Sequence, residues 1–381
     1  MKLKKVLAAV LAVTLLAACF AGCGESEQKA TSAASSGGSK ASSTASAEGG
    51  VAYVDLSGKD IVIGVATGSA GTSWRDQSMR QLSKVFDEYK AAGQIKDYKL
   101  VNNKTNGDAN EQATIIRNFI DDPDVNVIMV NPNDATALNE ALEDAIKAGK
   151  LVIAFDATVT AKGVLNVTND HYNYAYLPTK ELLELAGGKG TAVEISGLDG
   201  HPADVLRIEG TDAALKEYPD VELLANQPGG WDNTTAKQVM ASFLSSGMKP
   251  DIIITQDSEA FGILQACQDA DFLPKVMNGD GTKAFFEEWK KLRDAGADFD
   301  VVVAPNPPAI SATAGRIAVS LAHGKQFKDG VLTDGNIYMY QIAKTYSNKN
   351  FDEGWEQVQN LSAEECLDDY LTQEQTDALF K

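Results

Sequence analysis

The sequence predicts an α/β protein that consists of two doubly wound, parallel-sheet lobes. A length of 381 residues allows two domains with appendages. Short apolar segments alternate with longer segments in which apolar residues recur at helical spacing, a pattern that is typical of right-handed βαβ units and parallel sheets. The alternation stops and starts again midway along the chain, which indicates two lobes instead of one.

The first run of alternating segments predicts the first lobe. Strands are expected at residues 61–65, 98–101, 125–130 and 151–155. Helices are expected at residues 73–89, 111–120 and 135–148. In the first of these helices Leu82, Val85 and Phe86 lie near helical spacing, and in the second Ile116 and Phe119 share one face. Each helix therefore offers one apolar face to a sheet.

The second run of alternating segments predicts the other lobe. Strands are expected at residues 191–195, 221–224, 251–255, 275–277 and 301–304. Helices are expected at residues 207–218, 234–245, 258–270, 283–295 and 309–323. A single barrel would need eight evenly spaced units around one closed sheet. Two open sheets are therefore the favoured interpretation.

Residues 1–23 have the features of a lipoprotein signal peptide. Three lysines precede an apolar stretch at residues 6–16, which is too short for a membrane span because such a helix needs ~20 residues. Small residues and a cysteine follow, as signal-peptide processing requires. Both Cys19 and Cys23 fit such a site. We expect a lipid anchor at one of them on the outer face of the cytoplasmic membrane, with ordinary secretion as the alternative.

Residues 24–57 are expected to form a flexible tether between the anchor and the folded body. They are rich in serine, alanine and glycine and contain few large apolar residues. A segment of this composition cannot bury enough apolar surface to form a core.

Charge and cysteine content restrict the possible partners and cross-links. A formal net charge of −19 disfavours nucleic acid and anionic membrane surfaces as partners. Beyond the signal peptide only Cys267 and Cys366 remain, and their separation matches neither a metal motif nor a disulfide framework. Export would permit a disulfide between them. We expect instead two buried side chains that act as small apolar groups.

Most signatures of catalytic chemistry are missing from the sequence. The three histidines, His171, His201 and His323, are not spaced as a helical zinc pair. No Gly-x-Ser-x-Gly, His-Glu-x-x-His, dinucleotide-binding or P-loop pattern occurs. We therefore expect a protein that is not an enzyme and that needs neither a metal nor a cofactor.

Carboxylates and tryptophans follow several of the predicted strands. Asp156, Asp257 and Asp280 each come soon after a strand, where ligands bind in open parallel sheets. Trp74 and Trp231 are expected in loops after strands. An aromatic face beside carboxylates suits a sugar ring, because the ring has apolar C–H patches and a polar rim. Packing in a core is the alternative for each tryptophan.

Seven short segments follow one another along the chain: DANEQ at 108–112, VNPNDA at 130–135, VIAFD at 152–156, RIEG at 207–210, QPGGWD at 227–232, TQDSE at 255–259 and NGDGT at 278–282. Their order resembles that in type I periplasmic binding proteins of the ribose, xylose and galactose group. Each segment is a weak signal alone. Their order and spacing over more than 200 residues make the resemblance specific.

The resemblance implies a fold and a mechanism. Members of this family have two α/β lobes joined by a three-segment hinge, and they close on a ligand in the cleft. The closed form docks on the permease of an ABC importer. Applied here, it implies a monomeric sugar carrier with a first lobe of residues 58–168 plus about 306–335. The second lobe would comprise residues 169–305 plus about 336–381.

The resemblance also implies the ligand contacts. The residues at matching positions are Trp74, Arg75, Asn131, Asp156, Asp204, Trp231, Asp257, Asp280 and Asn306. Ribose binders have arginines at the positions of Ala157 and Val205, and a glutamine near Asn306. Asp204 and His201 lie close enough in sequence to substitute. The pocket therefore does not resemble a ribose pocket, and the ligand could be another sugar, a polyol or a cationic solute.

Two other functional hypotheses stay open at this point. The same body could act as a sensor for a membrane receptor kinase, or it could bind a nucleoside, an autoinducer or an amino acid. A secreted hydrolase that uses Asp156 and Asp280 as acid and base is the third hypothesis. It has little support because no nucleophile or oxyanion hole can be identified in the sequence.

Overall fold

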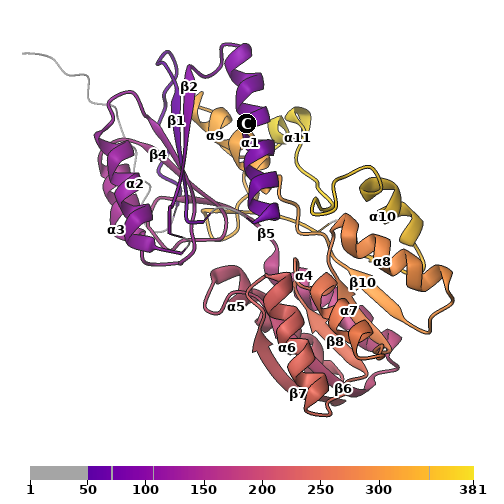
Figure 1. The fold of residues 1–381 in the computed structure, drawn as a ribbon. Coiled ribbons are helices and arrows are strands. Elements are labelled where there is room, and N and C mark those ends of the chain that lie inside the picture. The colour runs from indigo at the N-terminus through magenta and orange to yellow at the C-terminus, as the bar shows by residue number, and fades with distance from the viewer. Residues whose placement is uncertain (1–49, 70–71, 106, 343) are drawn as a thin grey trace, which may run out of the picture. The chain divides into compact units, whose positions relative to one another are not determined.

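The computed structural model describes residues 50–69, 72–105, 107–342 and 344–381, which form two parallel-sheet α/β lobes (Figure 1). This result confirms the predicted fold class. The predictions for residues 1–49, including the signal peptide, Cys19, Cys23 and most of the tether, lie outside the described residues.

The first lobe contains a six-stranded parallel sheet in the order β11-β5-β4-β3-β1-β2. Its strands are β1 (Val62–Thr67), β2 (Asp97–Asn102), β3 (Val127–Asn131), β4 (Leu151–Asp156), β5 (Leu165–Asn169) and β11 (Ile337–Tyr340). Its main helices are α1 (Ser73–Ala91), α2 (Ala109–Asp121), α3 (Asn139–Lys147) and α9 (Ile310–Ala322). Helices α1 and α9 cover one face of the sheet, and α2 and α3 cover the other (Figure 1).

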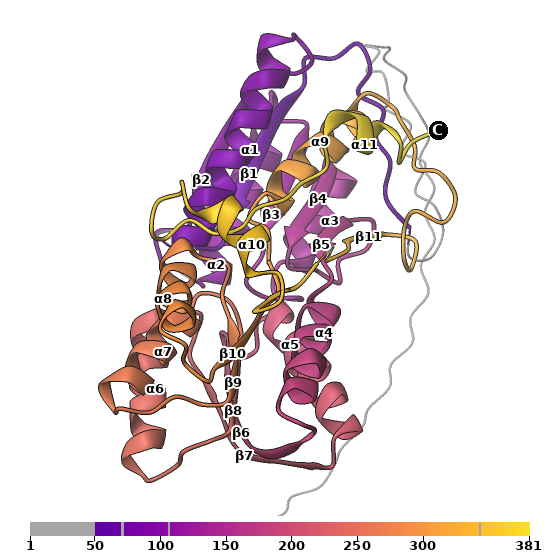
Figure 2. The ribbon, with the colours of Figure 1, turned by 90° about the vertical axis from the view of Figure 1, so that its right-hand side faces the viewer.

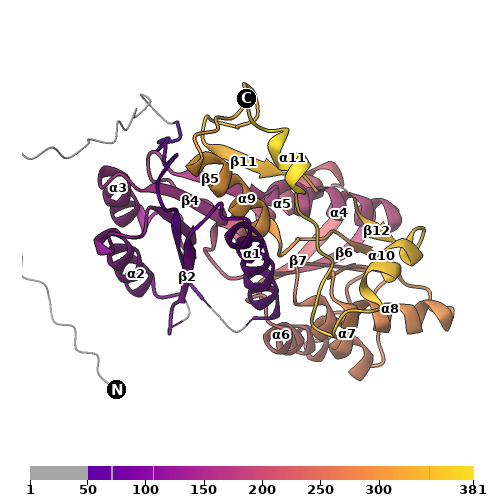
Figure 3. The same ribbon diagram turned by 90° about the horizontal axis from the view of Figure 1, so that it is seen from above.

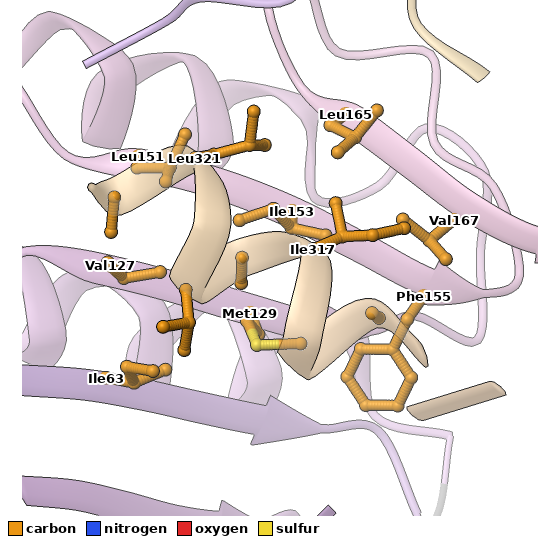
Figure 4. Packing of buried hydrophobic residues seen from close by; sticks show 14 of the residues in the cluster. Ile63, Val127, Met129, Leu151, Ile153, Phe155, Leu165, Val167, Ile317 and Leu321 are labelled. Atoms are coloured by element: carbon orange, nitrogen blue, oxygen red, sulfur yellow. The ribbon is translucent and has the colours of Figure 1, made fainter. Parts of the chain in front are cut away.

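Both faces of this sheet are buried, which explains why its strands are apolar along most of their length. Alternate side chains of a strand point to opposite faces, so Ile63 packs on the α1 and α9 side while Val62 packs on the α2 and α3 side. Figure 4 shows Met129 and Ile153 of neighbouring strands against Ile317 of α9. Strands of parallel sheets that have helices on both faces are typically apolar along their whole length.

The second lobe contains a six-stranded sheet in the order β12-β10-β9-β8-β6-β7. Its strands are β6 (Lys189–Ser196), β7 (Asp220–Pro228), β8 (Ile252–Thr255), β9 (Val276–Gly279), β10 (Asp300–Val303) and β12 (Tyr346–Ser347), of which only the last is antiparallel. Its helices are α4 (His171–Leu185), α5 (Pro202–Glu217), α6 (Asn233–Ser245), α7 (Ala260–Asp269), α8 (Lys283–Asp294) and α10 (Phe351–Val358). Helices α4 and α5 lie on one face, and α6, α7 and α8 lie on the other (Figure 2).

Several helices begin at a side chain that caps free backbone N–H groups. Thr72 accepts a hydrogen bond from the backbone of Arg75 at the start of α1. Asp232 caps α6, and Thr282 caps α8 in the same way. Oxygen-bearing side chains are preferred at this position because the first four N–H groups of a helix have no partner inside it. These caps define where the loops beside the strand ends stop.

Sequence reasoning did not identify β5 and α4. Pro178 lies inside α4, and a proline in a helix interior removes one hydrogen bond and usually ends the helix. Here Pro178 is buried within the helix, so packing outweighs the local preference.

The predicted tether extends too far along the chain. Val51, Val54 and Leu56 belong to the core of the first lobe. The backbone N–H of Ala52 donates to the carbonyl of Gly163 at 2.8 Å. The prediction that the tether continues to residue 57 was therefore wrong. A few apolar side chains within a polar stretch are enough to anchor that stretch in the core of the first lobe.

The assignment of residues 336–381 to the second lobe was also wrong in part. Strand β11 pairs with β5 of the first sheet. Helix α11 (Gln373–Asp377) packs against α9, and Phe380 stacks on Phe327 with 4.7 Å between ring centroids. Contacts with the second lobe come from Ile342, Thr345, β12, α10 and the segment that directly follows α10. Apolar residues late in the chain thus return to the first core.

In the part of the chain that the structure describes, four chain segments consequently connect the lobes. The three that the resemblance implied run from β5 to α4, from β10 to α9 and from β11 to β12. The fourth runs from α10 to α11 and passes beside α1 (Figure 3).

The remaining expectations concern cysteines and membrane spans. Cys267 and Cys366 are both buried and have free thiols, as expected. Within the described ranges, no helix has the length and apolar character needed to cross a membrane.

Leu56 tests whether residues 50–57 belong to the folded body. It is 1% exposed in the first core, so Leu56→Ala should lower the free energy of unfolding by about 2–5 kcal/mol through lost burial and a residual cavity. Denaturant titration of the parent and the variant measures this difference. Lys59→Ala, at an exposed position, is the control. If Leu56→Ala changes the free energy of unfolding by less than about 0.5 kcal/mol, residues 50–57 belong to the tether and not to the folded body.

Candidate functional site

A cluster of polar and aromatic side chains occupies the carboxyl ends of the strands in both sheets. Strands β3 and β4 end at Asn131 and Asp156. Asp257 follows β8 by two residues, and Asp280 directly follows β9. This is the edge at which open parallel sheets bind ligands.

Asp156 is the centre of the part of the site that the first lobe supplies. Its backbone has a φ of 68°, and its buried carboxylate accepts a hydrogen bond from the side-chain amide of Asn131 at 3.2 Å. Burial raises the pKa of Asp156, while the positive charges of Arg75 and Arg207 oppose that rise. Burial thus favours the protonated form of this carboxyl group, and the two nearby cations favour its charged form.

Arg75 brings a guanidinium group from the first turn of α1 toward Asp156. Its Nη2 donates to the side-chain oxygen of Asn133 at 3.1 Å. Its Nη1 and the Oδ1 of Asn131 are buried and have no hydrogen-bond partner among the described residues. A buried donor and a buried acceptor without partners are costly, and both would be satisfied by a polar ligand.

Arg207 of α5 is the centre of the part that the second lobe supplies. It is 2% exposed and forms an ion pair with both oxygens of Asp257. Its guanidinium carbon lies 4.2 Å from the ring centre of Tyr174 and 5.4 Å from that of Trp231. Cation–π contacts of this kind stabilise a desolvated arginine.

His171, the first residue of α4, joins these two parts. Its Nδ1 accepts from Nε of Arg207 at 3.3 Å. Because arginine can only donate, the ring proton is assigned to Nε2, which lies 3.2 Å from the backbone carbonyl of Asp156. Burial and, next, the charge of Arg207 hold the pKa of His171 well below 6.5. His171 is therefore a neutral connector between two charged groups.

Trp231 is held rigidly at the start of the loop before α6. Its backbone has a φ of 55°, and its N–H donates to Glu259 at 2.7 Å. Its indole nitrogen donates to the side-chain oxygen of Gln256 at 2.8 Å. The rings of His201 and Trp231 are nearly perpendicular, with 4.8 Å between their centres. The half-buried indole thus has a fixed orientation.

Asp204 and Asp280 are buried with their own partners inside the protein. Asp204 accepts from the backbone of Gly197 at 2.7 Å and from Gln256 at 2.8 Å. Asp280 accepts from the backbone and the hydroxyl of Thr282. Burial raises the pKa of both carboxyl groups. Both carboxylates order the loops beside the strand ends, and contact of either with a ligand stays a prediction.

Asn306 links the remaining members of the site. Its carbonyl accepts from the indole nitrogen of Trp74 at 2.9 Å, and its side-chain amide donates to Asp257 at 2.6 Å. Asn169, at the end of β5, donates to its side-chain oxygen at 2.7 Å. Both tryptophans therefore donate a hydrogen bond into the polar network, while Trp74 also packs against the core of the first lobe.

The structure brings most of the nine predicted residues into one hydrogen-bonded network. The members joined through Arg207, His171 and Gln256 are Trp74, Asn131, Asp156, Asp204, Trp231, Asp257 and Asn306. Arg75 interacts with Asp156 through its charge, and Asp280 approaches the backbone of Phe261.

Sequence reasoning did not place Arg207, His171, Gln256, Tyr174 or Glu259 in the site. Arg207 and Gln256 stand inside segments that carried the family resemblance, so a signal existed for them. His171 and Tyr174 lie in α4, a helix that sequence reasoning missed.

The site offers donors and acceptors next to an indole face. Within the residues that the structure describes, no group of three or more histidine, cysteine or acidic side chains is arranged to hold a metal ion. Such a site suits a small ligand with a polar rim and an apolar face.

Comparison with known proteins places the chain among binding proteins. A family model described as a periplasmic binding protein domain matches residues 63–326. The xylitol-binding protein of Mycolicibacterium smegmatis is 29% identical over 188 residues, which cover 49% of this chain and 53% of that protein. The galactofuranose-binding protein of Escherichia coli is 25% identical over 265 residues, which cover 64% of this chain and 79% of that protein. The chain spans only about half the length of the xylitol-binding protein.

Solved structures have the same fold. An ABC transporter solute binding protein from Thermobispora bispora gives a TM-score of 0.72 at 25% identity and covers 83% of this chain and 94% of its own. A solute binding protein from Bacillus halodurans, solved with bound myo-inositol, gives 0.64 at 20% identity and covers 78% of this chain and 98% of its own. The second likeness concerns the fold alone.

His201 should make stability depend on pH. Burial, followed by the charges of Arg75 and Arg207, lowers its pKa to about 3, against ~6.5 when unfolded. Below pH ~6.5 the unfolded chain binds a proton that the folded chain refuses, so the free energy of unfolding should fall by about 1.4 kcal/mol per pH unit.

His201→Asn keeps a helix-capping side chain but removes this titration. The parent should therefore lose stability relative to the variant between pH 6 and pH 4, as measured by denaturant titration. His323→Asn, at an exposed position, is the matched control. If the difference in the free energy of unfolding between parent and variant stays constant over this pH range, the lowered pKa of His201 is contradicted.

Proposed function

Because this chain belongs to the family of periplasmic binding proteins, we propose that it is the extracytoplasmic solute-binding component of an ABC importer. We propose that it captures a monosaccharide or a similarly small sugar or polyol. The family match covers residues 63–326, which include every residue predicted to contact the ligand.

The observation that carries this proposal is the composition of the site. Arg207 is paired with Asp257 and Arg75 lies near Asp156. Burial raises the pKa of Asp204 and Asp280 and so disfavours their charged forms. The site therefore presents little net charge for an ionic ligand to neutralise. Free donors and acceptors remain on Arg75 and Asn131. A hydroxyl group both donates and accepts, so a neutral polyhydroxylated ligand fits such a set better than an acid or an amine.

The relatives support the same substrate class. Their names include binders of xylitol, apiose, ribose and galactofuranose. Xylitol is a linear polyol and the others are sugars, so what these ligands share is a series of neighbouring hydroxyl groups. We carry only this shared chemistry over to the present chain.

Capture would proceed by a change in the relative populations of open and closed arrangements. Because the candidate contacts come from both lobes, a ligand makes all of them only when the lobes are together. Binding therefore shifts the population toward the closed form, which would dock on the permease. The sensor hypothesis uses the same closure but has less support than import.

The location proposed for the protein is the outer face of the cytoplasmic membrane. The apolar leader and the cysteines Cys19 and Cys23 support a lipid anchor, and the family is extracytoplasmic. We propose a monomer that is not an enzyme.

A thermal-shift screen tests the substrate class. The chain would be heated with pentoses, hexoses, deoxysugars, polyols, nucleosides and amino acids. A ligand at 100 times its dissociation constant stabilises by about 2.7 kcal/mol, which gives a readable shift of the melting temperature. A shift with a sugar or polyol is expected. A shift only with a nucleoside or an amino acid would overturn the proposed substrate class.

Trp231 tests the site itself. Trp231→Ala should weaken sugar binding by about 1–3 kcal/mol, because the apolar face of the ligand loses its cover. Isothermal titration calorimetry with the ligand from the screen measures this loss. Tyr172→Ala removes an aromatic ring that is 37% exposed on α4 and serves as the control. Equal affinity of the Trp231 variant and the parent would remove Trp231 from the site.

A further inference from the structure

The chain segment after α10 is bound to the second lobe by its backbone. This segment comprises residues 361–371 and is called the C-terminal strap. Three backbone bonds fix its first half: Lys283 N–H to Glu365 at 3.0 Å, Ala284 N–H to Ala363 at 2.9 Å and Leu367 N–H to Gly281 at 2.9 Å. The strap thus follows the loop that leads from Asp280 into α8.

The second half of the strap is bound to the first lobe. The carboxylate of Asp368 accepts from the backbone N–H of Ala309 at 2.8 Å, at the start of α9. The backbone N–H of Leu371 donates to the hydroxyl of Thr313 at 3.1 Å. The strap therefore changes lobe between Leu367 and Asp368, and it lies beyond the end of the family match at residue 326.

Gln77 of α1 is bound at this point of change. Its amide nitrogen donates to the carbonyl of Cys366 at 3.0 Å, and its oxygen accepts from the N–H of Cys366 at 3.1 Å. The same nitrogen lies 3.2 Å from the carboxylate of Asp368, to which Gln81 also donates at 3.0 Å. Gln77 is 5% exposed, so water cannot easily replace these bonds.

The place of Gln77 connects it to both parts of the site. It stands two and three residues after Arg75 and Trp74 in the same helix. Gln77 binds the backbone of Cys366, and Cys366 pairs with Thr282 in an isolated antiparallel β-bridge. The backbone N–H of Thr282 in turn donates a hydrogen bond to the carboxylate of Asp280. One side chain therefore joins the helix that carries two candidate contacts to the loop that carries a third.

We propose that Gln77 is a positioning residue of the binding site, which latches α1 to the C-terminal strap and so holds the two lobes together. The four chain segments that connect the lobes are covalent and stay intact when the lobes separate. The Gln77 contact is a set of hydrogen bonds that can break, so it resists opening without preventing it. The ligand-related part of this inference rests on the proposed function, while the latch itself does not.

Distance measurement between the lobes tests the latch without a ligand. Spin labels would be placed at Asp121→Cys in the first lobe and Ser245→Cys in the second, which are exposed positions. The full chain would carry Cys19→Ser and Cys23→Ser, and the buried Cys267 and Cys366 would stay unlabelled. Pulsed electron resonance should give a longer and broader distance distribution for Gln77→Leu than for the parent.

A matched control separates the latch from a general effect on this contact. Arg80→Ala removes an exposed ion pair between α1 and Glu365 of the same strap, and exposed pairs contribute little. Its distance distribution should equal that of the parent. Equal distributions for Gln77→Leu and the parent would overturn the latch.

Gln77→Glu is a second variant of nearly identical shape, for use if Gln77→Leu does not fold. It loses the bonds that Gln77 donates and places a carboxyl group beside Asp368, whose pKa burial raises to about 6. At pH 8 the two carboxylates should repel and lengthen the distance, and at pH 5 a shared proton should restore the parent distribution. No difference from the parent at either pH would also overturn the latch.

The ligand adds a kinetic readout. With the sugar identified by the screen, Gln77→Leu should release it about tenfold faster, because lost buried hydrogen bonds favour the open form. Stopped-flow fluorescence measures the association and dissociation rate constants. Unchanged dissociation would overturn the role of Gln77 in the site. If no sugar binds the parent, the proposed function fails, and the distance comparison still decides the latch.

Discussion

The burial of one guanidinium group determines much of the arrangement around the site. Arg207 is almost fully removed from water, and an uncompensated charge in such a place would cost several kcal/mol. Its compensation comes from the carboxylate of Asp257, the ring nitrogen of His171 and the faces of two aromatic rings. Each partner is held in one orientation as a result. The site is thus built around an internal charge before any ligand arrives.

The network also explains why the hinge region and the site are one structure. His171 begins the first helix after the chain has crossed to the second lobe, and Asn306 lies in the second crossing. Both residues hydrogen-bond to side chains of the site. The lobe rotation that we propose would therefore alter the contacts of Asp257 and Arg207 directly. No separate pathway is needed to connect closure with binding.

Sequence reasoning predicted the two sheets because strands that are buried on both faces are recognisable as short apolar segments. It failed where local signals conflict with tertiary packing. Pro178 disfavours the helix in which it lies, and two residues such as Val51 and Leu56 were too few to indicate that this segment packs in the core. The late chain was assigned to one lobe although its apolar residues serve both cores.

The candidate site was predicted in part for a physical reason. Asp156 and Asp257 follow strands, and the ends of parallel strands meet at one edge. Arg207 and His171 act through partners far away in sequence, Asp257 and Asp156, so spacing along the chain does not indicate their roles. Whether each of the nine predicted residues touches a ligand stays a prediction.

The path of the chain has a mechanical consequence. The backbone N–H of Leu56 donates a hydrogen bond to the carbonyl of Ala322, and the backbone N–H of Lys381 donates one to the carbonyl of Gln326. Both ends of the folded body therefore leave from the first lobe. A pull on the preceding segment, or a load attached at the last residue, would be borne by that lobe alone. The second lobe would carry none of that load and would move only within the limits that the four connecting segments and the Gln77 contact set.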